Sequence, residues 1–318
     1  MQRLRRLKMK PDLRVMLQET ALRTELLVAP LFVVHGSGVK TPVSSMPDVY
    51  QLSIDYVLRE VQELCDIGIR GILLFGVPML KDAHGSEASD DHGIIQKTVR
   101  AIKNKTPEAV VITDVCLCEY TSHGHCGIVE QGVIDNDQTV KRLAEIALSH
   151  ARAGADMVAP SDMMDGTVAA IRTALDGAGF ENLPIMAYAA KFASSLYAPF
   201  REAAQSKPSF GDRRSHQLNA ANSKEAMRAL QRCADEGADI LMVKPALPNL
   251  DILAKAKERF SLPLAAYQVS GEYSMIKAAG EKGYLDTNAV MYETLLSIRR
   301  AGADLIITYF AKEIATQL

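Results

Sequence analysis

Short apolar segments rich in valine, isoleucine and leucine recur eight times along this chain of 318 residues, and this repetition constrains its fold more than any other feature. The segments show little alternation of polar and apolar residues, which is typical of strands buried on both faces, as in a parallel sheet. They are LVAPLFVVHG (27–36), GILLFGVP (71–78), AVVITDVC (109–116), DMVAPSD (156–162), LPIMAYAAK (183–191), DILMVKP (239–245), LPLAAYQVSG (262–271) and DLIITYF (304–310).

Helical patterns lie between these segments. In each, apolar residues return every three or four positions and a glycine stands near the end, where a helix commonly terminates. The clearest patterns cover residues 55–68, 140–154, 166–179, 223–237 and 290–302.

A short signature marks three of the passages from helix to strand. It reads AGAD at 153–156, EGAD at 236–239 and AGAD at 301–304. We expect Gly154, Gly237 and Gly302 to take the left-handed conformation that ends a helix. The repetition is therefore interpreted as structural.

Eight strands that alternate with helices indicate the α/β class and favour a (β/α)₈ TIM barrel. A doubly wound open sheet is the alternative, but no G-x-G-x-x-G turn follows the first apolar segment. We predict one barrel domain over residues 25–318, preceded by an extended, basic N-terminal arm over residues 1–24 that lies outside the core.

Composition excludes several classes of protein. The first ten residues carry five positive charges, but the apolar stretch of a signal peptide does not follow. No run approaches the ~18 uninterrupted apolar residues of a membrane span. A net charge of −2 gives no field that would favour nucleic acid. Five cysteines, an odd number, suit a reducing compartment, so we expect a cytoplasmic location without nucleic-acid or membrane partners.

Two lysines end consecutive apolar segments, Lys191 in MAYAAK and Lys244 in LMVKP. In a barrel, chemistry takes place where the strands end. Neighbouring strands lie about 4.8 Å apart, so the two ammonium groups should be close, and repulsion and burial should lower both pKa values. A neutral lysine attacks carbonyl compounds and forms a Schiff base. The alternative is that each lysine only extends to the solvent at the barrel mouth.

A cysteine-rich stretch, TDVCLCEYTSHGHCGI, follows the third segment and contains Cys116, Cys118 and Cys126. The C-x-C spacing is too tight for an easy disulfide, and a redox C-x-x-C pair is absent. Three thiolates can hold Zn²⁺ with one position open, as catalytic zinc requires. The alternative is three incidental loop cysteines. Asp114, His123 and His125 are possible outer partners of the metal; Cys65 and Cys233 lie on helical patterns and are predicted to be core residues.

A long loop after the fifth segment, from Phe192 to about Asn222, carries several groups suited to binding a carboxylate. It contains Tyr197, Arg201, Lys207, Arg213, Arg214 and Gln217. A solvated lid with surface charge is the alternative interpretation. Hydroxyl and carboxyl groups at the ends of other segments should face the same barrel mouth, namely those of Ser161, Asp162, Ser270 and Tyr309.

Taken together, several motifs resemble the porphobilinogen synthase (5-aminolevulinate dehydratase) family, in its zinc-dependent type. They are TDVCLCEYTSHGHCGI, KFASSLYAPFREA, FGDRRSHQLN, LMVKPALPNLDI, YQVSGEYSMI and ITYFA, and they span most of the chain from about Pro30 to Phe310. The resemblance implies a hydro-lyase that condenses two molecules of 5-aminolevulinate to porphobilinogen, with loss of two waters, in tetrapyrrole and haem biosynthesis.

The resemblance also implies roles for individual residues. Lys191 and Lys244 match the family's Schiff-base positions, and the three cysteines match its catalytic zinc ligands. The residues around one substrate carboxylate are matched by Arg201, Arg213 and Gln217, and those around the other by Ser270 and Tyr309. Asp114 is expected to assist proton transfer, and Tyr197 and Ser161 to contact substrate.

Assembly and regulation follow from the same resemblance. Family members are commonly homo-octamers in which the N-terminal arm wraps a neighbouring barrel. Members with an allosteric Mg²⁺ site carry a glutamate fifteen residues before the second lysine, whereas this chain has Ala229 there, which argues against such a site.

Two other functions fit part of the sequence. A generic lysine Schiff-base aldolase would explain one strand-end lysine but neither the second lysine nor the cysteines. A non-catalytic zinc-binding scaffold would explain the cysteines but not the lysines.

Overall fold

Eight parallel strands form the barrel wall in the computed structural model, which describes residues 1–318. Around the barrel they are β8 (Met157–Pro160), β5 (Val110–Val115), β4 (Gly71–Val77), β1 (Leu27–Val34), β12 (Leu305–Thr308), β11 (Leu264–Gln268), β10 (Ile240–Lys244) and β9 (Met186–Lys191). A parallel bridge between Val158 and Ile185 joins the two ends of this order. The predicted (β/α)₈ barrel is confirmed, and each predicted apolar segment contains one of its strands.

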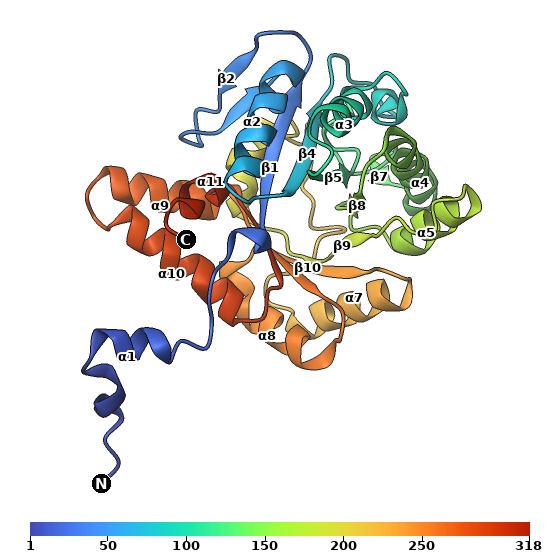
Figure 1. The fold of residues 1–318 in the computed structure, drawn as a ribbon. Coiled ribbons are helices and arrows are strands. Elements are labelled where there is room, and N and C mark those ends of the chain that lie inside the picture. The colour runs from blue at the N-terminus through green and yellow to red at the C-terminus, as the bar shows by residue number, and fades with distance from the viewer.

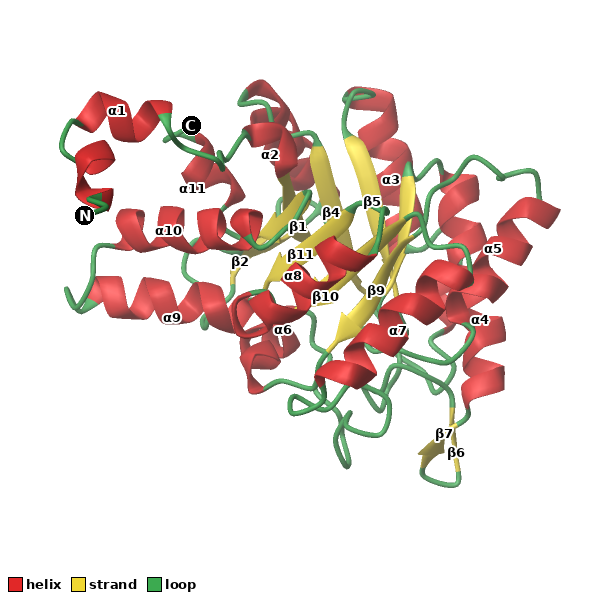
Figure 2. Cartoon of the chain, turned by 90° about the horizontal axis from the view of Figure 1, so that it is seen from below, coloured by secondary structure: helices red, strands yellow, loops and turns green.

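Helices surround the barrel on its outer side (Figures 1 and 2). They are α2 (Ile54–Asp66), α3 (Ile94–Lys105), α4 (Asn136–Ala153), α5 (Thr167–Gly177), α7 (Ser223–Asp235), α8 (Leu250–Arg259), α9 (Ser270–Glu281), α10 (Thr287–Arg300) and α11 (Ala311–Ala315). All five predicted helical patterns are confirmed. The strands are buried on both faces because helices cover the outside and side chains fill the inside. This explains why polar and apolar residues do not alternate along them.

The three glycines of the repeated signature take the expected conformation. Gly154, Gly237 and Gly302 have φ values of 97°, 97° and 121°. A side chain at Gly302 would also approach the Lys257 side chain to 2.6 Å. The signature is therefore structural, as predicted, and it directs each helix back into the barrel.

The N-terminal arm extends away from the barrel (Figure 1). It contains a short 3₁₀ helix, η1 (Leu4–Lys8), and one helix, α1 (Pro11–Met16), and neither contains a buried residue. A second 3₁₀ turn, η2 (Thr24–Leu26), leads into β1. None of the helices combines the length and the apolar character that crossing a membrane would need.

Two long segments cover the carboxyl end of the barrel. We call residues 116–128, which follow β5, the cysteine loop, and residues 192–222, which follow β9, the lid loop. The lid loop contains the turn η4 (Ser195–Tyr197) and the helix α6 (Ala198–Ala203). Two antiparallel hairpins add to the barrel: β2 (Lys40–Pro42) with β3 (Tyr50–Leu52), and β6 (Val129–Glu130) with β7 (Val133–Ile134).

Candidate active site

The two lysines stand side by side because of a bulge in strand β9. Leu241 pairs with Ala187 and Val243 with Ala190, so β9 contains one more residue than β10 between these pairs. The extra residue shifts the register, and Lys191 then pairs with Lys244. Bulges of this kind re-aim side chains and are frequent beside active sites.

Lys244 is enclosed by aromatic rings. Its Nζ lies 4.2 Å from the ring centroid of Tyr267, and the rings of Tyr188, Tyr197 and Phe200 lie 5.0–5.3 Å away. The side chain is 5 % exposed. Burial, followed by the charge of Lys191, lowers the Lys244 pKa to about 7. The predicted shift is therefore confirmed for this lysine, which can lose its proton near neutrality.

Lys191 behaves differently, and the prediction of a lowered pKa is wrong for this lysine. Burial alone would lower its pKa, but the negative charges of Cys126, Cys116, Cys118 and Asp114 together outweigh burial and raise it. Its Nζ also donates a hydrogen bond to the backbone oxygen of Ser161. The sequence placed the cysteine loop next to the barrel mouth, but it did not reveal that the sulfurs lie close enough to stabilise this cation.

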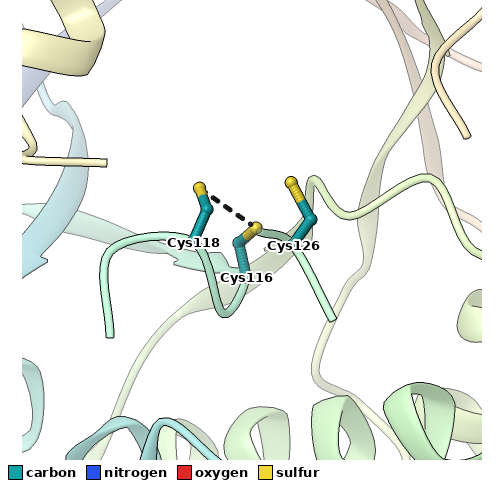
Figure 3. Close-up of side chains that lie close together, drawn as sticks. All are labelled: Cys116, Cys118 and Cys126. Carbon is teal, nitrogen blue, oxygen red and sulfur yellow. Dashed lines mark hydrogen bonds between the residues drawn. The ribbon is translucent and has the colours of Figure 1, made fainter. Parts of the chain in front are cut away.

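The three cysteines of the cysteine loop converge (Figure 3). Their sulfur atoms all lie within 4.8 Å of one another, and those of Cys116 and Cys118 are 3.5 Å apart. Sulfur ligands about 2.3 Å from a tetrahedral zinc ion lie about 3.8 Å apart, so this spacing fits. All three residues are buried, and hydrogen bonds from Cys116 and Cys118 hold the pKa of Cys126 well below its usual value. The donor set thus suits Zn²⁺ with one position open.

The histidines of the cysteine loop face the lid loop. His125 shares a hydrogen bond of 2.9 Å between its Nε2 and the backbone oxygen of Phe210, and the two rings lie 4.4 Å apart. The oxygen of His123 accepts a hydrogen bond from the backbone N–H of Ser209. Neither histidine belongs to the cluster of sulfur atoms. These residues join the two loops, a role that the sequence did not suggest.

Asp114 lies beside the sulfur cluster at the end of β5. Its Oδ2 accepts a hydrogen bond from the Ser161 hydroxyl at 3.1 Å, while its Oδ1 is buried without a partner. Burial and the charge of Glu119 raise the Asp114 pKa to about 8. Sequence reasoning missed Glu119, which is 2 % exposed and whose carboxylate lies within 4.8 Å of the Cys116 sulfur. Its position directly after Cys118 was the available signal.

Three polar side chains of the lid loop present unpartnered atoms. Arg213 donates to the backbone oxygens of Gly124 and Ser206, at 2.8 and 2.5 Å, but its Nε has no partner. The amide nitrogen and oxygen of Gln217 have no hydrogen-bond partner, and neither has the Nε of Arg201. Buried donors without partners are costly and point to a ligand that accepts from them.

The remaining lid-loop residues have other environments. Tyr197 is buried, and its hydroxyl donates to the backbone oxygen of Phe192 at 2.7 Å. Lys207 and Arg214 are exposed, as the alternative of a solvated lid predicts.

The hydroxyl and carboxyl groups predicted at the other strand ends already make hydrogen bonds within the protein. Ser270 begins α9 instead of ending a strand, and its Oγ donates to the Leu196 oxygen and accepts from the Phe200 N–H. The Tyr309 hydroxyl lies 3.0 Å from that of Tyr267. The Asp162 carboxylate accepts hydrogen bonds from the Met164 N–H and the Thr167 hydroxyl in the turn before α5.

Away from this site, Ala229 lies in a surface pocket beside α7. The side chains of Arg228 and Arg232 line the same pocket together with Glu225. Two guanidinium groups beside a pocket repel a divalent cation.

A narrow pocket at the barrel mouth brings six of the predicted site residues together. It is lined by Cys118, Glu119, Ser161, Lys191, Tyr197, Arg213 and Lys244, together with Phe75 and Phe200. Two lysines, one thiol, one carboxyl group and one arginine therefore line the same enclosed space. These groups suit a small carbonyl compound with a carboxylate, because an arginine can bind the carboxylate and a neutral lysine can attack the carbonyl.

Comparisons with known proteins agree with this arrangement. The sequence pattern of the family described as delta-aminolevulinic acid dehydratase matches residues 1–317. The delta-aminolevulinic acid dehydratase of Archaeoglobus fulgidus is 56 % identical over 316 residues, which cover 99 % of this chain and 98 % of that protein. The Bacillus subtilis enzyme of the same name is 52 % identical over 314 residues, covering 99 % and 97 %.

A solved structure is similar over the whole chain. The delta-aminolevulinic acid dehydratase (porphobilinogen synthase) of Toxoplasma gondii, in complex with the reaction product porphobilinogen, superposes with a TM-score of 0.98 at 44 % identity. The match covers 100 % of this chain and 92 % of that one. On these grounds the chain belongs to the delta-aminolevulinic acid dehydratase family.

Proposed function

We propose that this enzyme condenses two molecules of 5-aminolevulinate to porphobilinogen, with loss of two waters, in tetrapyrrole biosynthesis. The observation that carries the proposal is the pairing of Lys191 with Lys244 in a pocket that Cys118 also lines. The complex of the Toxoplasma gondii relative with porphobilinogen supports the same reaction.

Each lysine forms a Schiff base with the ketone of one substrate molecule. The neutral amine adds to the carbonyl carbon, and the carbonyl oxygen then leaves as water, which gives an iminium ion. The iminium withdraws electrons and makes a neighbouring C–H acidic enough to lose a proton, so that a carbon–carbon bond can form. Lys244 is suited to be the first nucleophile because its pKa is about 7. Holding both substrates in one pocket lowers the entropic barrier to their joining.

Cys116, Cys118 and Cys126 would hold a zinc ion at this site. When bound, Zn²⁺ supplies a Lewis acid that keeps a substrate amine or a hydroxide unprotonated, as ring closure requires. Asp114 stands next to the sulfurs with one unpartnered oxygen and is placed to accept or return a proton. We do not propose an allosteric Mg²⁺ site.

The lid loop recognises one substrate carboxylate. Arg213, Arg201 and Gln217 would donate hydrogen bonds to it from N–H groups that lack protein partners. Closure of the loop over the pocket also excludes water from the iminium ions. Ser270 and Tyr309 would contact the second carboxylate, which requires that Ser270 exchange one of its present hydrogen bonds for the substrate.

One experiment tests the whole proposal. The enzyme is incubated with 5-aminolevulinate and assayed with a pyrrole colour reagent, and a second sample is reduced with borohydride and digested for mass spectrometry. We expect pyrrole formation and a substrate adduct on Lys244 or Lys191. An adduct without pyrrole would indicate a generic lysine aldolase, and zinc binding with neither product would indicate a non-catalytic scaffold.

We also propose that the protein forms homo-octamers through the N-terminal arm and works in the cytoplasm. The arm exposes apolar side chains that a partner subunit would cover, among them Leu4, Leu7 and Met16, which are 70 %, 57 % and 79 % exposed. The five cysteines of the chain are all free thiols, which suits a reducing compartment.

A further inference from the structure

Tyr188 lies between the two lysines and has no role in the proposal above. Its ring centroid is 5.6 Å from the Nζ of Lys191 and 5.0 Å from that of Lys244. In a regular strand, residues 188 and 191 would point to opposite faces. The bulge in β9 places both in the barrel interior, because the extra residue between Ala187 and Ala190 turns the strand end.

The hydroxyl of Tyr188 differs from those of its tyrosine neighbours. Tyr267 and Tyr309 are hydrogen-bonded to each other, and Tyr197 donates to a backbone oxygen. Tyr188 is 2 % exposed, and its hydroxyl has no partner. A buried hydroxyl without a partner loses the hydrogen bonds that it would make to water, whereas phenylalanine would fill the same space without that cost.

The neighbouring group that suits this hydroxyl is the carboxyl of Asp114. Its Oδ1 is also buried without a partner, while its Oδ2 already accepts from Ser161. Asp114 is close enough to Tyr188 to raise the pKa of the phenol, after burial. The backbone oxygen of the same Ser161 accepts from Lys191, so Asp114, Ser161 and Lys191 form one connected group beside Tyr188.

We propose that Tyr188 is a positioning residue: its hydroxyl donates a hydrogen bond to Oδ1 of Asp114 when substrate fills the pocket, and so fixes this carboxyl beside Lys191 for proton transfer. The ring at the same time forms a wall shared by both lysines. This inference rests on the proposed function, because it acts through the role given to Asp114. It adds a residue that holds the proton-transfer group in place without touching the reacting atoms.

The test replaces Tyr188 with phenylalanine, which keeps the ring and removes only the hydroxyl. We expect kcat to fall at least tenfold, while KM stays within twofold and the borohydride adduct still forms. The thermal midpoint should stay equal or rise, because the lost hydroxyl makes no hydrogen bond in the folded protein. Tyr284→Phe is the matched control, since Tyr284 is 79 % exposed, and it should leave every measurement unchanged.

A double variant separates action through Asp114 from any other role. In an Asp114→Ala background, the further change Tyr188→Phe should lower kcat by less than twofold, because residues that act as one unit are not additive. The proposal is overturned by an unchanged kcat in Tyr188→Phe, by a tenfold loss that persists in the Asp114→Ala background, or by a loss of kcat that accompanies unfolding. Failure of the proposed function would show instead as a wild-type enzyme that makes no pyrrole.

Discussion

Lys191 and Lys244 are paired residues on neighbouring strands, yet their surroundings shift their pKa values in opposite directions. Aromatic rings surround Lys244, and burial dominates there. The sulfur atoms and Asp114 stabilise the charge on Lys191. At neutral pH, the site therefore contains one lysine able to act as a nucleophile and one that stays protonated until negative charge near it is neutralised. The two lysines therefore differ in protonation state, so two identical substrate molecules meet two different amines.

The first prediction concerns pH. Lys244 reacts only when neutral, so borohydride trapping of substrate on this residue should increase with pH and reach half its maximum near pH 7. Replacing Lys191 with methionine removes the positive charge that is the second cause of the lowered pKa. The midpoint should then move upward; a rise of about one unit would reduce the neutral fraction at pH 7 roughly fivefold. Quantitative mass spectrometry of the Lys244 peptide measures this.

A midpoint that stays the same in Lys191→Met would show that the two lysines do not influence each other. Trapping, not turnover, must be measured, because the substitution also removes the second Schiff base. Lys255→Met is a suitable control, since Lys255 is a surface residue of α8 paired with Asp251.

The second prediction concerns the metal. Cys118→Ala removes one of three sulfur ligands, and we expect both bound zinc and pyrrole formation to fall to background. Zinc is measured by elemental analysis after dialysis against a weak chelator, independently of activity. Cys65→Ala removes a buried thiol on α2 outside the cluster and should keep the metal. Full activity of metal-free Cys118→Ala would refute the zinc role.

The third prediction uses two adjacent arginines. Arg213 is 4 % exposed and lines the pocket, whereas Arg214 is exposed and pairs only with Asp212. Arg213→Ala should raise KM for 5-aminolevulinate at least tenfold, because a buried charge-assisted contact to a carboxylate is lost. Arg214→Ala should leave KM within twofold. Equal effects from both substitutions would argue against a specific carboxylate contact.

The fold could be predicted from sequence because its signal is local and repeated. Each strand is a continuous apolar run, and Gly154, Gly237 and Gly302 mark the return turns with a conformation that favours glycine. The hairpins β2–β3 and β6–β7 carry no such signal, since their strands are only two or three residues long. The start of α9 at Ser270 was also missed, because the preceding apolar run continues smoothly into it.

The site could be predicted only as far as residue type and strand end allow. The sequence indicated that Lys191 and Lys244 would be neighbours, since both end consecutive strands. It did not indicate the bulge in β9, which depends on pairing between strands and brings Tyr188 to the same side as Lys191. The opposite pKa shifts also depend on distances to atoms far away in sequence, as do the contacts between the cysteine loop and the lid loop.

The fourth prediction concerns the N-terminal arm. Leu7 and Met16 are exposed apolar residues of the arm, and covering them would favour association of subunits. The double change Leu7→Asp and Met16→Asp should lower the particle mass in sedimentation velocity, while the circular dichroism of the barrel stays the same. Met79→Asp is the control, because Met79 is 71 % exposed but lies outside the arm. An unchanged mass in the arm variant would contradict assembly through this segment.

The last prediction concerns the contact between the cysteine loop and the lid loop. Phe210 packs on the His125 ring and accepts its hydrogen bond through the backbone, while Ser209 donates to the His123 oxygen. Phe210→Ala removes the ring contact, so the lid loop should open more often, and trypsin should cleave after Arg214, which Ser215 follows, at least threefold faster.

Zinc affinity should stay unchanged in Phe210→Ala, because the sulfur atoms do not depend on this ring, whereas KM should rise as Arg213 leaves the pocket with the open lid. Phe260→Ala is a useful comparison, since it removes a partly buried ring at the end of α8, far along the chain from the lid. If both variants were cleaved after Arg214 at the wild-type rate, the contact between the His125 and Phe210 rings would not be what holds the lid closed, and the hydrogen bonds of Arg213 to Gly124 and Ser206 would be sufficient for that role.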